Sequence, residues 1–332
     1  MSDKPGNDSN GHDGHHGHHG HDPRDSDLDR RQRAVVFAYH NVGVRCLKVL
    51  LAGGVDVALV VTHRDDPDEN IWFDSVLSLC REERIPCITP DDASSADLLE
   101  QVRAATPDVI FSFYYRHLLP ADLLAVAPAF NMHGSLLPEY RGRAPINWAV
   151  LHGANITGAT LHEMTARPGA GAIVSQMEVP ILPDDTAWEV SAKVTVAAEQ
   201  TLWRVLPSLL DGSAPRLYND LRQGACFGRR TPEDGRIDWR RPARHVYNLH
   251  RAVAPPYPGA FTDVDGVRYT IGRARLSGNF GNVVALGLPL GLTVVDNCIF
   301  GVCGDGHMLA ISSLSADGAP ITAAQLQARL RG

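Results

Sequence analysis

Short apolar runs alternate with amphipathic segments through the first part of this chain, and this alternation limits the possible folds more than any other feature. The runs predict strands, and the segments between them predict helices. The predicted strands are Ala34–Tyr39, Val55–Val61, Ile85–Thr89 and Asp108–Tyr115, and the predicted helices are Val44–Ala52, Trp72–Glu83 and Leu98–Ala104. Regular alternation is typical of a doubly wound parallel sheet, so we predict an α/β domain with Rossmann-like architecture.

The sequence changes character from about Pro215. A strand is predicted over Arg236–Trp239 and a helix over Ala243–Val253, and short alternating runs separated by Gly and Asp follow. These runs are Val267–Ile271, Val283–Leu286, Leu292–Val295 and Met308–Ile311. They predict a small antiparallel β-barrel, so we expect two folded domains, over residues 33–214 and 215–332.

Residues 1–32 contain Gly, His, Asp, Ser and Asn with almost no apolar side chains, and we expect this tail to be disordered. Six of its histidines alternate with glycine, namely His12, His15, His16, His18, His19 and His21. Such a tract can bind Ni or Zn loosely, because the chain imposes no geometry on the imidazoles. We interpret the segment as a dispensable tail and predict no metal site in the folded part.

Charge and composition exclude several classes of protein. The formal net charge of −7 argues against a polyanionic partner, so we expect no nucleic acid. No apolar run approaches the roughly 18 residues of a membrane helix, and the polar N-terminus differs from a signal peptide. The first strand-to-helix turn, Ala38–Gly43, is not GxGxxG, and GxxxxGK[ST] does not occur, so no dinucleotide or P-loop site is predicted. We expect a cytoplasmic protein without membrane insertion.

Asn131 and His133 lie two residues apart at the end of an apolar segment. If this segment is a strand, both side chains point to the same side. An amide can hold a developing oxyanion and an imidazole can move a proton, which are the functions that acyl transfer to an amine requires. Ligands of doubly wound sheets bind beyond the carboxyl ends of the strands, where His133 and His117 fall. The simpler alternative is a strand end whose polar residues cap a loop. We interpret His40 and His162, in apolar surroundings, as structural.

The motif Asn131–Pro138 (NMHGSLLP), followed by Tyr140–Trp148 (YRGRAPINW), resembles the folate-dependent formyltransferases. Similar segments at Val36–His40, Phe111–Leu118, Cys226–Pro232 and Ala252–Phe261 extend the resemblance over nearly the whole chain from Ala34. Within the family, the chain is most similar to the formyltransferase domain of the bifunctional UDP-4-amino-4-deoxy-L-arabinose enzyme of lipid A modification and polymyxin resistance. The resemblance implies a stand-alone enzyme with the formyltransferase fold and a C-terminal OB-like domain.

The resemblance also implies the reaction, which is transfer of a formyl group from the co-substrate 10-formyltetrahydrofolate to the amine of a nucleotide-linked amino sugar. The expected acceptor is UDP-4-amino-4-deoxy-L-arabinose. By the same resemblance His133 acts as general base or proton shuttle, and Asn131 stabilises the oxyanion. The implied folate pocket contains His117, Leu118, Leu119 and Arg143, with Thr165, Ala166, Arg167 and Pro168 on its other side. A homo-oligomer remains open.

The chain departs from the family at Gly169, where relatives carry an Asp in the pattern Asp-Ala-Gly-Ala-Ile-Val. That Asp is expected to orient the His and to raise its pKa. Neutralising the analogous Asp of a serine protease lowers kcat about 10⁴-fold, so a large loss is the default expectation. Three interpretations stay open. The chain is a weakened or inactive natural member, an altered variant of an active enzyme, or an active enzyme in which Glu163 or Glu139 supplies the carboxylate.

Two other functions stay open. Methionyl-tRNA formylation shares the His-Gly-Ser-Leu-Leu-Pro core, but it requires a basic C-terminal barrel that the acidic net charge does not favour. A folate- or sugar-nucleotide-binding pseudoenzyme is the non-enzymatic alternative, and Gly169 is the residue that motivates it.

Overall fold

The computed structural model describes residues 31–64, 71–277 and 287–331. The described residues from Gln32 onward belong to one compact unit. Nearly all of the predicted tail, residues 1–32, and the whole predicted strand Val283–Leu286 lie outside the described residues. Of the helices in the described ranges, none is both long and apolar enough to span a bilayer.

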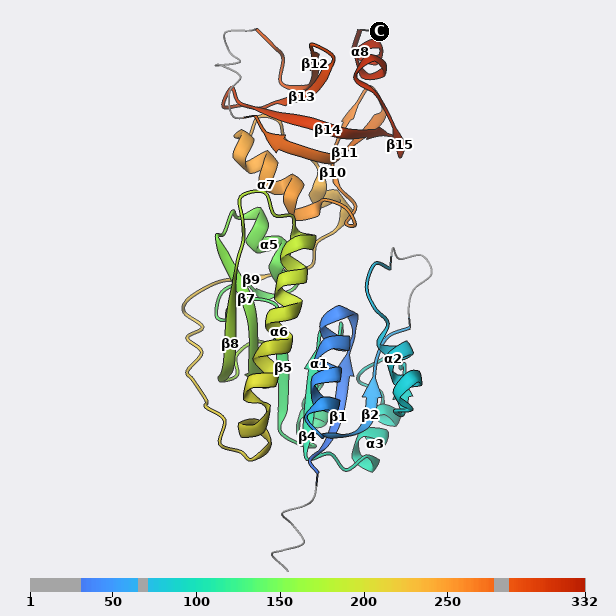
Figure 1. Ribbon diagram of the computed structural model, residues 1–332, viewed down its shortest axis with the longest axis vertical. Coiled ribbons are helices and arrows are strands. Elements are labelled where there is room, and N and C mark those ends of the chain that lie inside the picture. Colours follow the sequence, from blue (N-terminus) through green and yellow to red (C-terminus); the bar gives the residue numbers. More distant parts are fainter. Residues whose placement is uncertain (1–30, 65–70, 278–286, 332) are drawn as a thin grey trace, which may run out of the picture. The chain divides into compact units, whose positions relative to one another are not determined.

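Seven strands form the sheet of the first domain, in the order β3-β2-β1-β4-β5-β7-β8 (Figure 1). The strands are β1 (Arg33–Ala38), β2 (Asp56–Val61), β3 (Cys87–Ile88), β4 (Val109–Phe113), β5 (Ala129–His133), β7 (Ile156–Glu163) and β8 (Ile173–Pro180). The first five strands in this order are parallel, whereas β7 is antiparallel to both β5 and β8. The predicted doubly wound α/β fold is confirmed, but the sheet is mixed, because β7 runs opposite to both of its neighbours. Strands β7 and β8 can pair in this way because no crossover helix separates them.

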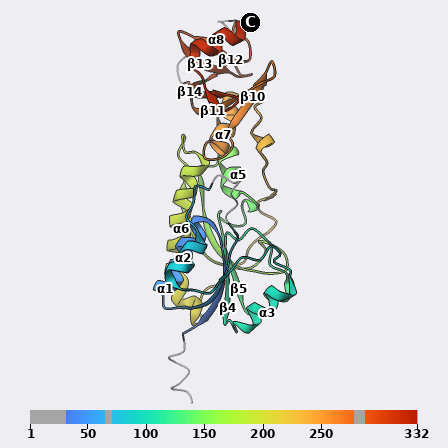
Figure 2. The same ribbon diagram turned by 90° about the vertical axis from the view of Figure 1, so that its right-hand side faces the viewer.

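Helices cover both faces of this sheet (Figure 2). One face carries α1 (His40–Ala52), α2 (Val76–Glu83) and α6 (Ala187–Leu210), and the other carries α3 (Ala96–Ala104) and α4 (Ala121–Leu124). In β1, Val36 and Ala38 point into the core under α1 and α6, while Val35 and Phe37 point into the core under α3. All four are fully buried, which explains why this strand is apolar throughout.

A six-stranded antiparallel sheet forms the second domain, with the path β10-β11-β14-β13-β12 and with β15 paired to β14. The strands are β10 (Ala260–Val264), β11 (Val267–Leu276), β12 (Gly291–Val295), β13 (Cys298–Val302), β14 (Met308–Ala316) and β15 (Ala319–Pro320). Helix α7 (Ala243–Val253) packs on β11, and α8 (Ala323–Arg331) packs on β12. The predicted C-terminal antiparallel β fold is confirmed, and in the described residues it is a half-barrel, since β10 and β12 end the path without pairing with each other.

Several short elements lie outside these two sheets. Strand β6 (Arg141–Gly142) pairs in parallel with β9 (Cys226–Phe227), α5 (Pro145–Leu151) follows β6, and the 3₁₀ helix η1 (Pro232–Gly235) follows β9. The predicted strand Arg236–Trp239 is wrong, since this segment forms only an isolated bridge to β10.

Helix α1 begins earlier than predicted. It starts at His40 rather than Val44, directly after the extended residue Tyr39. The chain turns from strand to helix within one residue, because His40 has φ +65°. Apolar periodicity carries no sign of such a turn, which is rare for a non-glycine residue.

Candidate functional site

Strand β5 presents Asn131 and His133 on one side of the sheet. The strand lies between β4 and β7, and its side chains alternate in burial. Phe130 and Met132 are buried, whereas Asn131 and His133 are partly exposed. The predicted strand is confirmed, and the two polar side chains leave it on the same face.

The carboxyl ends of β1, β4 and β5 lie at one edge of the sheet (Figure 1). From β1 the strand order continues to β2 and β3 on one side and to β4 and β5 on the other, so the switch point lies between β1 and β4. Doubly wound sheets bind their ligands at such a point. His133 ends β5 and His117 follows β4, so both lie at this edge.

The backbone carbonyl of Tyr140 determines which nitrogen of His133 carries the proton. His133 Nε2 lies 2.9 Å from Tyr140 O. Because a carbonyl oxygen can only accept, Nε2 donates its N–H, and Nδ1 of the neutral ring holds the lone pair. Burial lowers the pKa of His133 below its ordinary value of 6.5, and the hydrogen bond to Tyr140 partly opposes this shift. His133 is therefore neutral at pH 7, with Nδ1 able to act as a base.

Buried hydrogen bonds hold the Tyr140 carbonyl in place. Ser135, which is fully buried, donates to the Glu139 carbonyl at 2.6 Å. Thr160 of β7 donates to the Ser135 carbonyl at 2.6 Å and accepts from Gln176 of β8 at 2.9 Å. Tyr140 itself has φ +51°, a left-handed conformation that costs about 1 kcal/mol in a non-glycine residue. The sheet thus stabilises a strained loop whose carbonyl points at the imidazole.

Gly134, directly after the imidazole, leaves room for Tyr114. A Cβ atom at position 134 would lie 2.0 Å from the Tyr114 hydroxyl oxygen, which is far inside van der Waals contact. This hydroxyl is buried and has no hydrogen-bond partner among the described residues, and burial raises the pKa of Tyr114. Packing alone therefore requires glycine at this position of the motif.

Gly169, the position at which the resemblance implies an Asp, lies in the loop between β7 and β8 with φ +69°. Its carbonyl accepts a hydrogen bond from Asn219 Nδ2 at 2.9 Å. A Cβ atom built at Gly169 would meet the side-chain carbons of Arg141 at 3.6 to 3.9 Å, which is ordinary contact. The Nε atom of Arg141 is buried without a hydrogen-bond partner in the described part of the chain. A side chain fits at position 169, and a carboxylate there would lie beside a guanidinium group.

Neither predicted substitute carboxylate contacts His133. Glu163 forms an ion pair with Arg216, and the side chain of Glu139 is exposed. Within residues 31–64, 71–277 and 287–331, no carboxylate forms a hydrogen bond or an ion pair with His133. The neutral carbonyl of Tyr140 is the group that orients its ring.

Of the residues predicted to line a folate pocket near the end of β4, some lie together on the surface and one does not. Arg143 donates from Nη2 to the carbonyl of Arg116 at 2.9 Å, which brings it beside His117 and Leu118. Leu118 is 69% exposed, whereas Leu119 is buried in the core under α3 and α4. His117, Leu118 and Arg143 are thus exposed and available to a ligand, whereas the side chain of Leu119 packs in the core and is not.

The predicted residues of the other side, Thr165, Ala166, Arg167 and Pro168, are exposed in the loop that also carries Gly169. The Thr165 hydroxyl donates to the Arg167 carbonyl at 2.9 Å, and Ala170 N–H donates to the same carbonyl at 3.2 Å. The loop is therefore a compact turn, and its side chains do not take part in the core.

Two histidines that were not predicted as site residues also lie at this edge. His63 follows β2 and stacks on Tyr115, with ring centroids 4.3 Å apart and an interplanar angle of 13°. Its Nε2 accepts the N–H of Arg116 at 3.0 Å. His162, expected to be structural, lies beside Asn131, with Nδ2 of Asn131 3.1 Å from Nε2 of His162. In the sequence, the one sign that His63 belongs to the site is its position just after a predicted strand. The place of His162 follows from the pairing of β5 with β7, which the sequence does not show.

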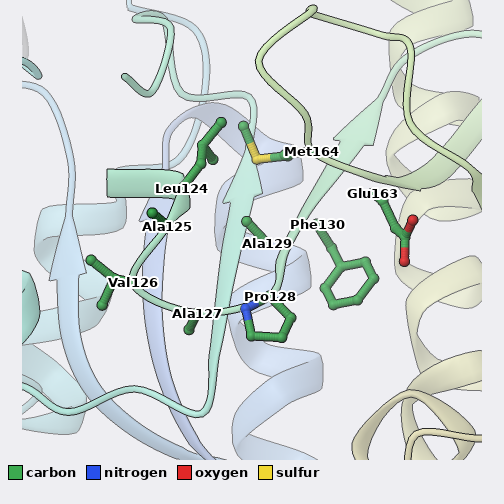
Figure 3. A pocket seen from close by; sticks show the side chains of 9 residues that line it. All are labelled: Leu124, Ala125, Val126, Ala127, Pro128, Ala129, Phe130, Glu163 and Met164. Atoms are coloured by element: carbon green, nitrogen blue, oxygen red, sulfur yellow. The ribbon is translucent and has the colours of Figure 1, made fainter. Parts of the chain in front are cut away.

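A hollow of about 420 Å³ lies at the opposite end of β5 (Figure 3). It is lined by residues 124–130 of the α4–β5 connection and β5, together with Glu163 and Met164. Figure 3 shows the Glu163 carboxylate beside Phe130, at the rim of this hollow. Neither Asn131 nor His133 lines it, so the hollow is separate from the edge that carries them.

Several solved structures of known proteins resemble this chain in fold. An N-formyltransferase from Helicobacter canadensis, solved with folinic acid and dTDP-3-aminofucose, aligns with a TM-score of 0.68 at 18% identity, over 85% of this chain and 99% of that chain. A sugar N-formyltransferase from Shewanella sp. FDAARGOS_354 aligns with a TM-score of 0.60 at 18% identity, over 73% and 96%. HypX from Aquifex aeolicus, in complex with tetrahydrofolic acid, aligns with a TM-score of 0.60 at 17% identity, over 90% of this chain and 47% of that chain. At these identities the likeness shows the fold.

The sequence itself matches two family models. The one described as formyl transferase, C-terminal domain, matches residues 229–331. The one described as formyl transferase matches residues 35–206, which hold most of β1, all of β4 and β5, and the Asn131–His133 pair. Because this second match covers more than half of the chain, the chain belongs to the formyl transferase family.

Proposed function

We propose that this chain transfers a formyl group from 10-formyltetrahydrofolate to the amine of a nucleotide-linked amino sugar. The observation that carries the proposal is the pair of Asn131 and neutral His133 on one face at the carboxyl end of β5. Family membership supports the reaction class, and the Helicobacter relative, solved with a folate and a dTDP-linked amino sugar, supports both substrate classes. The motif over residues 131–148 supports UDP-4-amino-4-deoxy-L-arabinose as the first acceptor to test.

In the proposed reaction a bond forms between the acceptor nitrogen and the formyl carbon, and the bond from that carbon to N10 of the folate breaks. His133 Nδ1 takes the proton that the amine loses, while Nε2 keeps its hydrogen bond to Tyr140 O. The resulting imidazolium then gives a proton to the leaving nitrogen. Asn131 donates an N–H to the formyl oxygen while this oxygen carries negative charge. A formamide and tetrahydrofolate leave, and His133 returns to its neutral state.

The residues at the switch point fit a folate. Leu118 offers exposed apolar surface, on which a flat ring system can lie. Arg143 offers a guanidinium group, which suits the carboxylates of the glutamate part of a folate. His117 packs edge-on against Tyr115 with ring centroids 5.6 Å apart, so it is held by contacts within the protein. We propose that these residues bind the co-substrate and that the loop with residues 165–168 closes the other side.

We also propose that the reaction is slower than in a relative with Asp at position 169. The Tyr140 carbonyl fixes the tautomer of His133, but a neutral carbonyl stabilises an imidazolium less than a carboxylate does. Of the three interpretations of Gly169, this supports a weakened but active enzyme. Because the imidazolium is stabilised less than by a carboxylate, the pseudoenzyme alternative also requires a direct test.

The test is an assay for release of free tetrahydrofolate with three acceptors, which are UDP-4-amino-4-deoxy-L-arabinose, a dTDP-linked 3-amino sugar and methionyl-tRNA. We expect turnover with an amino-sugar nucleotide and none with methionyl-tRNA. Asn131→Ala should lower kcat on the order of 10²-fold, because it removes the oxyanion donor. Turnover only with methionyl-tRNA would establish the alternative enzyme. Folate binding without product from any acceptor would establish a binding protein.

A further inference from the structure

Asn131 and His162 face each other across the junction of β5 and β7. The two strands are antiparallel, and Asn131 pairs directly with His162 in the register. Residues paired in this way have side chains on the same face of the sheet, close enough to interact. Nδ2 of Asn131 lies 3.1 Å from Nε2 of His162, which is hydrogen-bonding distance.

The proton positions in this contact follow from the other nitrogen of the ring. Nδ1 of His162 lies 2.7 Å from the carbonyl oxygen of Glu163. A carbonyl can only accept, so Nδ1 carries the proton, and Nε2 of the neutral ring is an acceptor. Asn131 must therefore offer its NH₂ group to Nε2, because its carbonyl oxygen would repel the lone pair. The contacts assign both the tautomer of His162 and the orientation of the Asn131 amide.

His162 stays neutral over the physiological range. Its side chain is 3% exposed. Burial and, to a smaller extent, the neighbouring His133 lower its pKa to about 4, although the hydrogen bond to Glu163 partly opposes the shift. The acceptor character of Nε2 therefore does not change between pH 5 and pH 9.

Fixing one N–H of a primary amide fixes the other. The NH₂ group of Asn131 has two donors in the plane of the amide. Once His162 accepts one, rotation of the amide by 180° would place its oxygen against the ring nitrogen, so that orientation is excluded. The second N–H then keeps one direction, which is what a preorganised oxyanion donor requires.

We propose that His162 is a positioning residue that holds the Asn131 amide with its free N–H directed at the formyl oxygen. The proposal rests on the proposed formyl transfer, in which Asn131 is the oxyanion donor. Each of the two reacting side chains then has its own neutral orienting group, His162 for Asn131 and the Tyr140 carbonyl for His133.

Three substitutions at one position test the role. His162→Phe keeps a flat aromatic ring, slightly larger than the imidazole, but cannot accept a hydrogen bond. We expect kcat to fall about tenfold, while KM for folate and for the sugar nucleotide stays within about twofold. The reason is that the Asn131 N–H, which His162 no longer orients, stabilises the charged formyl oxygen of the transition state and not the bound substrates. His162→Gln places an acceptor near the former Nε2 and should restore kcat to within about threefold of the original chain. His162→Asn is too short to reach Asn131 and should behave like His162→Phe.

The matched control is His250 of α7, which is likewise 3% exposed with a pKa lowered by burial to about 4. His250→Phe removes a comparable buried imidazole away from β5 and should leave kcat within about twofold. In the Asn131→Ala background, His162→Phe should cause no further loss, because the amide that it positions is already absent. An unchanged kcat in His162→Phe, no recovery in His162→Gln, or additive losses in the double variant would each overturn the proposal.

A measurement that does not depend on enzyme activity distinguishes this proposal from the proposed function. In ¹⁵N-histidine-labelled protein, the resonances lost in His162→Gln identify His162. We expect them to show the Nδ1–H tautomer between pH 5 and pH 8. In uniformly ¹⁵N-labelled protein, the Asn131 side-chain NH₂ signals should shift in His162→Phe. The Nε2–H tautomer would overturn the positioning role even in an active enzyme. The expected tautomer in a protein that releases no tetrahydrofolate would refute the formyl transfer and leave the His162–Asn131 contact established.

Discussion

At the scale of single residues, Gly169 is the position where a substitution is expected to raise the rate. We predict that Gly169→Asp increases kcat at least tenfold, since the resemblance implies a carboxylate at this position that stabilises the imidazolium of His133. The new Cβ makes only ordinary contacts with Arg141, at 3.6 Å or more. The positive φ of +69° opposes the change and should cost about 1 kcal/mol of stability. Release of tetrahydrofolate and urea unfolding measure the two effects separately.

The control for this prediction is Gly169→Asn. Asparagine has the shape of aspartate and tolerates positive φ equally well, but it has no charge. We expect the same loss of stability and no gain in kcat. If Gly169→Asp and the original chain had equal rates, the missing carboxylate would not limit the reaction. If Asn raised the rate as far as Asp, charge would not be the cause.

At the scale of elements, the end of β5 depends on the fit between Gly134 and Tyr114 of the β4 end. We predict that Gly134→Ala lowers the free energy of unfolding by about 1–3 kcal/mol, because the methyl group would lie 2.0 Å from the Tyr114 hydroxyl. Thermal unfolding measures the loss. The kcat should fall as well, since the displaced segment carries His133.

A second substitution distinguishes this clash from other effects of alanine. The Tyr114 hydroxyl has no hydrogen-bond partner among the described residues, so Tyr114→Phe should cost little alone. In the Gly134→Ala background it should recover part of the lost stability. Recovery would be incomplete, because the ring carbon that bears the hydroxyl would still lie 3.0 Å from the new methyl group. Strictly additive losses in the double variant would show that the two positions do not interact.

The sequence predicts elements better than it predicts the contacts between them. Helix α7 begins and ends at the predicted residues, because its start and its apolar face are local properties of the chain. The reversed direction of β7 is not visible locally, since the side chains of a strand alternate between the two faces of the sheet whichever way the neighbouring strand runs. The hydrogen bonds of Asn131 to His162 and of His133 to Tyr140 both depend on such pairing or on loop conformation. The motif therefore indicates the two reacting side chains, and only the structure shows what orients them.

At the scale of the whole molecule, two buried histidines make stability depend on pH. The pKa of both His162 and His250 is lowered to about 4, in each case mainly by burial, with a smaller contribution from His133 for His162 and from the positive charges of Arg251 and Arg275 for His250. In the unfolded chain their pKa is about 6.5. Between pH 6.5 and pH 4 the unfolded state therefore binds more protons, and the free energy of unfolding falls as the pH falls. Each histidine contributes on the order of 3 kcal/mol to this loss, and above pH 6.5 the contribution is fully retained.

His250→Phe isolates one of these two contributions. Between pH 7 and pH 5 an unfolded-state histidine becomes protonated while a folded-state pKa of about 4 keeps His250 neutral. We predict that the free energy of unfolding of His250→Phe falls by on the order of 2 kcal/mol less over this interval than that of the original chain. Urea unfolding at both pH values, with equal m-values as the sign of an unchanged native state, gives the difference. Because carboxylates titrate mainly below pH 5, they contribute little to it. An equal fall in both proteins would mean that His250 accepts a proton inside the folded chain, and that α7 accommodates an imidazolium beside Arg251.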